Sequence, residues 1–184
     1  MKRIFDAQLI GPFAAMLIVA VIVALTTERF LNPGNLSNLS LQVSIVALIA
    51  IGSTIVIFAA GIDLSSGSMI ALLTMILAQM LKFMGLPLAL AVPLILIVGG
   101  LLGLFIGLTT AYGRIPSFIT TLAGLIAFRG LALTFNNGSP IFSLDPALEP
   151  IFYGKVVGIP LPFFYLVFFY AIAAFAMNYT KLGR

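Results

Sequence analysis

The sequence contains no cysteine and no histidine, and only five of its 184 residues are acidic. Zinc centres, thiol nucleophiles and histidine-based proton relays are therefore excluded, because each depends on one of the two missing side chains. With so few carboxylates we expect neither a metal site nor a catalytic pair, and no enzymatic activity. They are Asp6, Glu28, Asp63, Asp145 and Glu149.

Charged residues are also scarce. They make up 8% of the chain, whereas 62% is hydrophobic and the mean hydropathy is +1.25. Soluble domains carry about 25% charged residues, and so few polar groups cannot cover this much apolar surface in water. Disorder is excluded by the same hydrophobicity. The composition is typical of an integral membrane protein, and the net charge of +4 reflects loop lysines and arginines rather than nucleic-acid binding.

Six stretches are apolar over the roughly 20 residues that a transmembrane helix needs. They predict an all-α, polytopic membrane protein with one transmembrane domain over residues 1–184. The first stretch is expected to remain as a span, because no signal-peptidase-like site follows it before Glu28. Ser37 or Ser40 is expected to cap the second helix. The six stretches are 9–27, 41–60, 66–84, 86–112, 117–135 and 160–179.

The lysines and arginines of the connections predict the orientation, since cytoplasmic loops carry an excess of them. With the N-terminus inside, five lie on the cytoplasmic side and three outside. We therefore expect both termini in the cytoplasm, and the longest connection, about 136–159, outside. The inner set is Lys2, Arg3, Arg114, Lys181 and Arg184, and the outer set is Arg29, Lys82 and Lys155.

The segment 61–68 is unusually polar for a junction between two apolar helices. It holds Asp63, three serines and two glycines, with almost no polar linker around them. One interpretation is a tight turn in which the Asp63 carboxylate caps the third helix. The other is a broken-helix element in which Asp63 and Ser65 line a polar pathway through the membrane.

Arg129 lies about 12 residues into the fifth span, where an arginine that faces lipid costs a few kcal/mol. Its side chain could extend to the interface or pair with a carboxylate such as Asp63. Alternatively, it faces the pathway and contacts solute. The sequence leaves both interpretations open.

Small residues mark two further features. Gly99, Gly103 and Gly107 recur at every fourth position of the fourth span, which predicts close helix packing within the chain or with a second copy. Asn137 belongs to an Asn-Gly turn after the fifth span and is a candidate pathway residue near the outer mouth.

Several motifs resemble those of the permease subunits of ribose-type sugar ABC importers, in the same order along the chain. The most distinctive is Gly-Ile-Asp-Leu-Ser at 61–65, followed by Gly67-Ser68. The others are Asn-Pro-Gly-Asn-Leu at 32–36, Ile-Pro-Ser-Phe-Ile-Thr-Thr-Leu at 115–122, Arg129-Gly130, Asn-Gly-Ser-Pro-Ile at 137–141 and Tyr-Thr-Lys-Leu-Gly-Arg at 179–184.

This resemblance implies a bacterial inner-membrane protein that forms a sugar translocation pathway with a second permease subunit, as a homodimer or a heterodimer. ATP-binding subunits below and a periplasmic solute-binding protein above are the implied partners. The chain has no nucleotide-binding loop, so ATP and magnesium are expected on the separate ATPase subunit. Family permeases are nearly twice as long, and we expect residues 1–184 to be the N-terminal half of one, ending at Arg184 before the segment that couples to the ATPase.

Three alternatives remain open from the sequence. A secondary transporter or channel would need no ATPase, but the spans lack the acidic or histidine relay that usually carries protons. A membrane scaffold subunit would use the glycine stripe for partner helices alone. A permease for branched-chain amino acids is a related importer class that differs in its solute.

Overall fold

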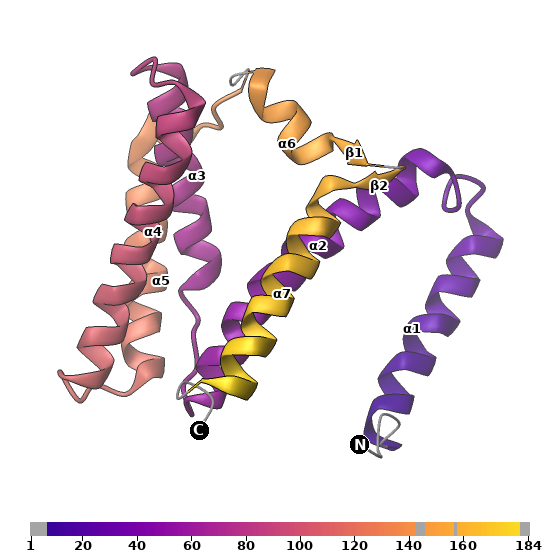
Figure 1. Cartoon of the computed structure of the whole chain (residues 1–184), viewed down its shortest axis with the longest axis horizontal. Helices are drawn as coiled ribbons and strands as arrows, with labels where there is room; N and C mark the ends of the chain where they lie inside the picture. Colours follow the sequence, from indigo (N-terminus) through magenta and orange to yellow (C-terminus); the bar gives the residue numbers. More distant parts are fainter. Residues whose placement is uncertain (1–6, 143–145, 157, 181–184) are drawn as a thin grey trace.

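The computed structural model describes residues 7–142, 146–156 and 158–180. Six long or medium helices dominate it (Figure 1), joined by short 3-10 turns, a five-residue helix and a two-stranded hairpin. The helices are α1 (Ala7–Thr26), α2 (Pro33–Phe58), α3 (Ser66–Lys82), α4 (Leu88–Ala111), α5 (Ser117–Thr134), α6 (Glu149–Tyr153) and α7 (Leu161–Tyr179). The turns are η1 (Phe135–Gly138) and η2 (Pro146–Leu148), and antiparallel β1 (Lys155–Val156) and β2 (Ile159–Pro160) form the hairpin.

The helices fall into three groups (Figure 1). Helices α3, α4 and α5 form one bundle, α2 and α7 lie side by side in the middle, and α1 stands apart. The chain runs up and down through these groups, so that the start of α1 and the end of α7 lie at the same end of the molecule. The short elements α6, β1 and β2 lie at the opposite end and connect the bundle to α7.

Two small apolar clusters hold the α3–α5 bundle together. In the first, Leu72 of α3 packs with Phe128 and Ala132 of α5. In the second, Leu81 and Ala91 join α3 to α4, and Leu148 of η2 closes this end of the bundle. The loop before η2 is also fastened to α3, because the Lys82 ammonium donates a hydrogen bond to the carbonyl oxygen of Phe142.

Helix α2 begins earlier than its apolar stretch predicts. Asn32 is its N-cap, and the Asn32 side chain accepts a hydrogen bond from the Gly34 N–H at 2.9 Å. Pro33 occupies the first turn, where its missing N–H has no consequence. The prediction that Ser37 or Ser40 caps this helix is wrong, since both lie inside it, and the Ser40 hydroxyl donates to the Leu36 carbonyl at 2.8 Å.

Among the residues that the structure describes, four helices are long and apolar enough to cross a membrane: Pro33–Phe58, Leu88–Ala111, Ser117–Gly138 and Leu161–Tyr179. Two further apolar helices, Ile10–Thr26 and Ser66–Lys82, are shorter. At 1.5 Å per residue the 17 residues of α3 extend about 25 Å, less than the roughly 30 Å of a bilayer core. Residues 61–65, which precede it, are not helical and continue its path toward the end of α2 (Figure 1).

The molecule exposes far more surface than a compact chain of its mass. Its accessible area is 13397 Å², whereas a compact protein of 19.5 kDa exposes about 8,500 Å². In each of α2 and α7 a single residue is buried, Ser44 and Pro162. The helix groups are therefore only partly packed on one another.

Candidate functional site

The polar segment that follows α2 forms a helix break rather than a tight turn. Ala59 and Ala60 end α2, residues 61–65 follow as irregular chain, and α3 starts at Ser66. Ser65 is fully buried and lies against Gly124 of α5, where an added Cβ would come within 3.2 Å of the Ser65 Cβ. Gly124 is seven residues, or about 10 Å, beyond the start of α5. The N-terminus of α3 is thus recessed by roughly two helical turns relative to that of α5.

Two hydroxyls of α5 hold the break in place. The Ile62 N–H donates to the Ser117 hydroxyl oxygen at 3.1 Å. The Thr121 hydroxyl lies 3.1 Å from the Ile62 carbonyl oxygen and 2.8 Å from the Ser117 carbonyl oxygen, so it can donate to either. Backbone groups that leave a helix inside a membrane require partners of this kind, because lipid offers none. Ser117 and Thr121, one turn apart, supply them.

Asp63 binds Ser65, the residue that immediately precedes α3. Its Oδ1 atom accepts hydrogen bonds from both the backbone N–H and the hydroxyl of Ser65, each at 2.7 Å. The carboxylate therefore shapes the chain just before the helix, and it sits near the positive end of the helix dipole, where a negative charge is stabilised. Asp63 and Ser65 are brought together here, and only Ser65 is fully buried.

Arg129 is exposed on α5, one residue beyond the buried Phe128. Within residues 7–142, 146–156 and 158–180 no ion pair joins it to a carboxylate, and the Asp63 carboxylate is engaged by Ser65 instead. Over the same residues no cluster of three or more carboxylates could hold a metal ion. The guanidinium of Arg129 is thus a positive charge presented on the outer face of the bundle.

Asn137 lies in the η1 turn at the far end of α5. Its φ angle is 52° and that of Asn136 is 48°, a left-handed conformation that asparagine tolerates better than most residues. Asn136 secures the turn by donating from Nδ2 to the Ser139 carbonyl oxygen at 3.1 Å. Asn137 is exposed there, remote from the helix break at the opposite end of α5.

The three glycines that recur at every fourth position of α4 are placed differently from one another. Gly99 lies against α3, since an added Cβ would be 3.0 Å from Leu73 Cδ1. Gly103 and Gly107 have nothing within 4 Å of such an atom. The most crowded glycine that joins two helices is Gly124, where a Cβ would meet Ile106 Cδ1 at 2.9 Å as well as Ser65. Sequence reasoning missed it, although Ser117, Thr121 and Gly124 recur at helical spacing on one face.

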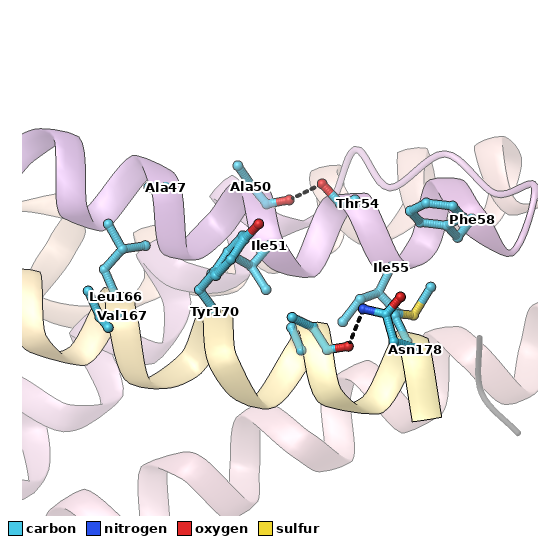
Figure 2. Close-up of a pocket in the computed structure, with 13 residues that line it drawn as sticks. Ala47, Ala50, Ile51, Thr54, Ile55, Phe58, Leu166, Val167, Tyr170 and Asn178 are labelled. Carbon is cyan, nitrogen blue, oxygen red and sulfur yellow. Dashed lines mark hydrogen bonds between the residues drawn. The ribbon is translucent and has the colours of Figure 1, made fainter. Parts of the chain in front are cut away.

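A groove of about 680 Å³ runs between α2 and α7 (Figure 2). Residues of α2 between 47 and 58 form one wall, and residues of α7 between 166 and 178 form the other. Most are alanine, isoleucine and other apolar side chains. A second hollow of about 410 Å³ shares Ile51, Ile55 and Ala173 with the groove and continues on the neighbouring face of the pair.

Three polar side chains interrupt this apolar groove. Thr54 donates to the Ala50 carbonyl oxygen at 2.7 Å, and Asn178 donates from Nδ2 to the Ala174 carbonyl oxygen at 2.8 Å. Figure 2 shows Tyr170 reaching from α7 toward α2 across the groove. The sequence gives no sign that Tyr170 shares a groove with Thr54, because that depends on which helices are neighbours.

The family model of the branched-chain amino acid transport system permease component matches residues 35–184. The chain belongs to this family. The matched region includes the helix break and both walls of the groove. No solved structure matches this permease-family chain.

Curated relatives of this permease-family chain are sugar importer subunits. It is 38% identical to the ribose import permease protein RbsC of Haemophilus influenzae over 176 residues, which are 94% of this chain and 54% of the relative. It is 39% identical to RbsC of Bacillus subtilis over 188 aligned residues, covering 100% of this chain and 58% of the relative. The xylose transport system permease protein XylH of Escherichia coli is 38% identical over 147 residues, 79% of this chain and 37% of the relative. The chain spans about half the length of the RbsC relatives.

Proposed function

We propose that this chain is part of the transmembrane permease subunit of an ABC importer that moves a monosaccharide across the bacterial inner membrane. The observation that carries the proposal is the 38% identity to a ribose import permease over 94% of the chain. The recessed N-terminus of α3, with Asp63 and Ser65 beside it, supports a polar element at membrane depth, as the neutral hydroxyl groups of a sugar would require.

The proposed topology has six crossings with both ends of the chain in the cytoplasm. Helix α3 makes its crossing together with residues 61–65, whose extended chain adds the length that 17 helical residues lack. Asp63, Ser65 and Arg129 are the proposed pathway residues, with Asn137 near the outer mouth. An exposed guanidinium in a membrane helix is costly in lipid, which supports a place for Arg129 on the pathway or against a partner subunit.

The proposed partners are a second permease subunit, ATP-binding subunits that carry ATP and magnesium, and a periplasmic binding protein that delivers the solute. ATP binding would shift the complex between outward-facing and inward-facing states, which requires that ATP favour one state over the other. The chain itself would supply walls and polar contacts to the pathway.

Uptake of labelled ribose, xylose and leucine by cells with and without the gene tests the function. We expect cells without the gene to lose uptake of a sugar but not of leucine. In cells with the gene, uptake of that sugar should follow the ATP supply rather than the proton gradient. Loss of leucine uptake alone would favour the branched-chain amino acid alternative that the family name suggests. Uptake that collapses with the proton gradient would favour a secondary transporter, and unchanged uptake of all three solutes would favour a scaffold.

The pathway residues are tested in the same cells by Asp63→Ala and Arg129→Ala. Each is expected to reduce sugar uptake at unchanged membrane levels of the protein, whereas Gly107→Ala, at a position with open space around it, is the control. Wild-type uptake in both variants would remove Asp63 and Arg129 from the pathway.

A further inference from the structure

The groove between α2 and α7 lies in a part of the molecule that is little buried. In Figure 1 these two helices occupy the middle of the array, where the most buried helices of a packed bundle normally lie. Only 6% of the apolar window of each is buried, against 28% for α5. The described part of the chain therefore leaves most of this central helix pair uncovered.

The groove has the shape and lining of a helix-packing surface. Ala47 and Ala50 of α2 and Ala173 and Ala174 of α7 contribute small side chains to it. Such residues allow a third backbone to approach closely, which is the main source of helix association in membranes. The groove follows its two helices for about three turns, and a helix about 10 Å across could lie along it.

The polar residues of the groove argue against the two simpler occupants. A sugar needs several convergent hydrogen-bonding groups, whereas Thr54, Tyr170 and Asn178 are scattered along an otherwise apolar surface. A lipid acyl chain offers no partner to the Tyr170 hydroxyl or to the Asn178 carbonyl oxygen. A protein helix does, because threonine, asparagine and similar side chains hydrogen-bond across helices in membranes.

We propose that the groove holds a transmembrane helix from the part of the permease that the relatives possess and residues 1–184 do not include. This inference rests on the proposed function, since it takes the RbsC relatives as the guide to the whole subunit. A little under half of their length has no counterpart in this sequence. The docking helix is uncharged on its contact face, carries small residues opposite Ala50 and Ala174, and offers a hydrogen-bonding side chain to Asn178.

Photocrosslinking from inside the groove tests this proposal with little added bulk. The probe is p-azidophenylalanine at Tyr170, a near-isosteric replacement of a side chain that reaches across the groove. The matched control carries it at Phe168, two residues away on α7, which is 60% exposed and does not line the groove. The importer is irradiated in native membranes, and the linked partners are identified by mass spectrometry.

We expect the Tyr170 probe to link to a transmembrane peptide of the importer outside residues 1–184, severalfold more than the Phe168 probe, which should react mainly with lipid. Lipid adducts at both positions, or links only to residues 1–184 of the same or a second copy, would overturn the proposal. If the Tyr170 variant is not assembled, the same probe at Phe58, on the α2 wall, gives the same test.

Sugar uptake, measured in the same cells with the wild-type protein, separates the two conclusions. A linked transmembrane helix without any sugar uptake would contradict the proposed function and leave the groove assignment standing. Sugar uptake with lipid adducts alone at Tyr170 would contradict only the groove assignment.

Discussion

The hydroxyl of Thr121 lies 3.1 Å from the carbonyl oxygen of Ile62, although 59 positions separate the two residues. Ser117 accepts the N–H of the same residue, so both backbone groups of Ile62 are served by one face of α5. These contacts connect the helix break to α5, the helix that packs most extensively on α3. The break is therefore a defined part of the bundle, and its stability should depend on α5.

Replacing Thr121 by valine tests this connection. Thr121→Val keeps the size of the side chain but removes the hydroxyl, and we expect a loss of about 1 kcal/mol in the free energy of unfolding. Thr134→Val is the matched control, because the Thr134 hydroxyl donates only to the Leu131 carbonyl of its own helix. Denaturant unfolding in detergent measures both, and equal stabilities of the two variants would contradict the connection.

Among the glycines inside helices α3, α4 and α5, Gly124 should be the least tolerant of a larger residue. Gly124→Ala places a Cβ 2.9 Å from Ile106 Cδ1 and 3.2 Å from Ser65 Cβ, and overpacking of this kind costs about 1–3 kcal/mol. Gly103→Ala has open space around it and should not destabilise the protein. Thermal unfolding of the two variants decides this prediction, which fails if Gly124→Ala is as stable as Gly103→Ala.

For the stability of the fold, the Asp63 carboxylate should matter chiefly through the oxygen that binds Ser65. Asp63→Ala leaves the Ser65 N–H and the fully buried Ser65 hydroxyl without their acceptor, at a cost of about 1–3 kcal/mol. Asp63→Asn keeps an oxygen in the same place and should retain most of the stability. Comparing the two variants by denaturant unfolding tests this difference. A variant Asp63→Asn as unstable as Asp63→Ala would show that the charge, and not the hydrogen-bond geometry, matters.

Ala60 adopts a left-handed backbone conformation, with a φ angle of 57°, where α2 ends. An L-residue with a Cβ costs about 1–2 kcal/mol in this region, and glycine avoids most of that cost. Ala60→Gly should therefore raise the unfolding free energy by about 0.5–1 kcal/mol. Ala59→Gly, at a φ angle of −80°, should lower it. Thermal unfolding that ranks the two variants in the reverse order would contradict this assignment.

The sequence predicts most helix ends because proline and glycine mark them. The fifth and sixth apolar stretches agree with α5 and α7 to within one residue. The start of α2 is missed by eight residues, because polar Asn35, Ser37 and Asn38 look like a loop although Asn32 already caps the helix. Hydropathy reports where a helix is apolar, whereas capping decides where it begins.

The candidate site is predicted less completely. The motif at 61–65 indicates Asp63 and Ser65, but the sequence does not distinguish a turn from a helix break, since both need the same polar residues. Their contact with α5, the crowding at Gly124 and the groove that Tyr170 crosses all depend on which helices are neighbours. Local spacing along one chain does not contain that information.

The start of α1 and the end of α7 lie at the same end of the molecule (Figure 1). This arrangement bears on the number of times the chain crosses the membrane. A polypeptide that enters and leaves on the same side of a barrier must traverse it an even number of times. In the topology proposed above, residues 61–65 and the 17-residue helix α3 together make one full traverse, because an odd total would separate the two ends. Reporter domains joined to the two ends would then share a compartment, and a single added span would move the second reporter to the other one.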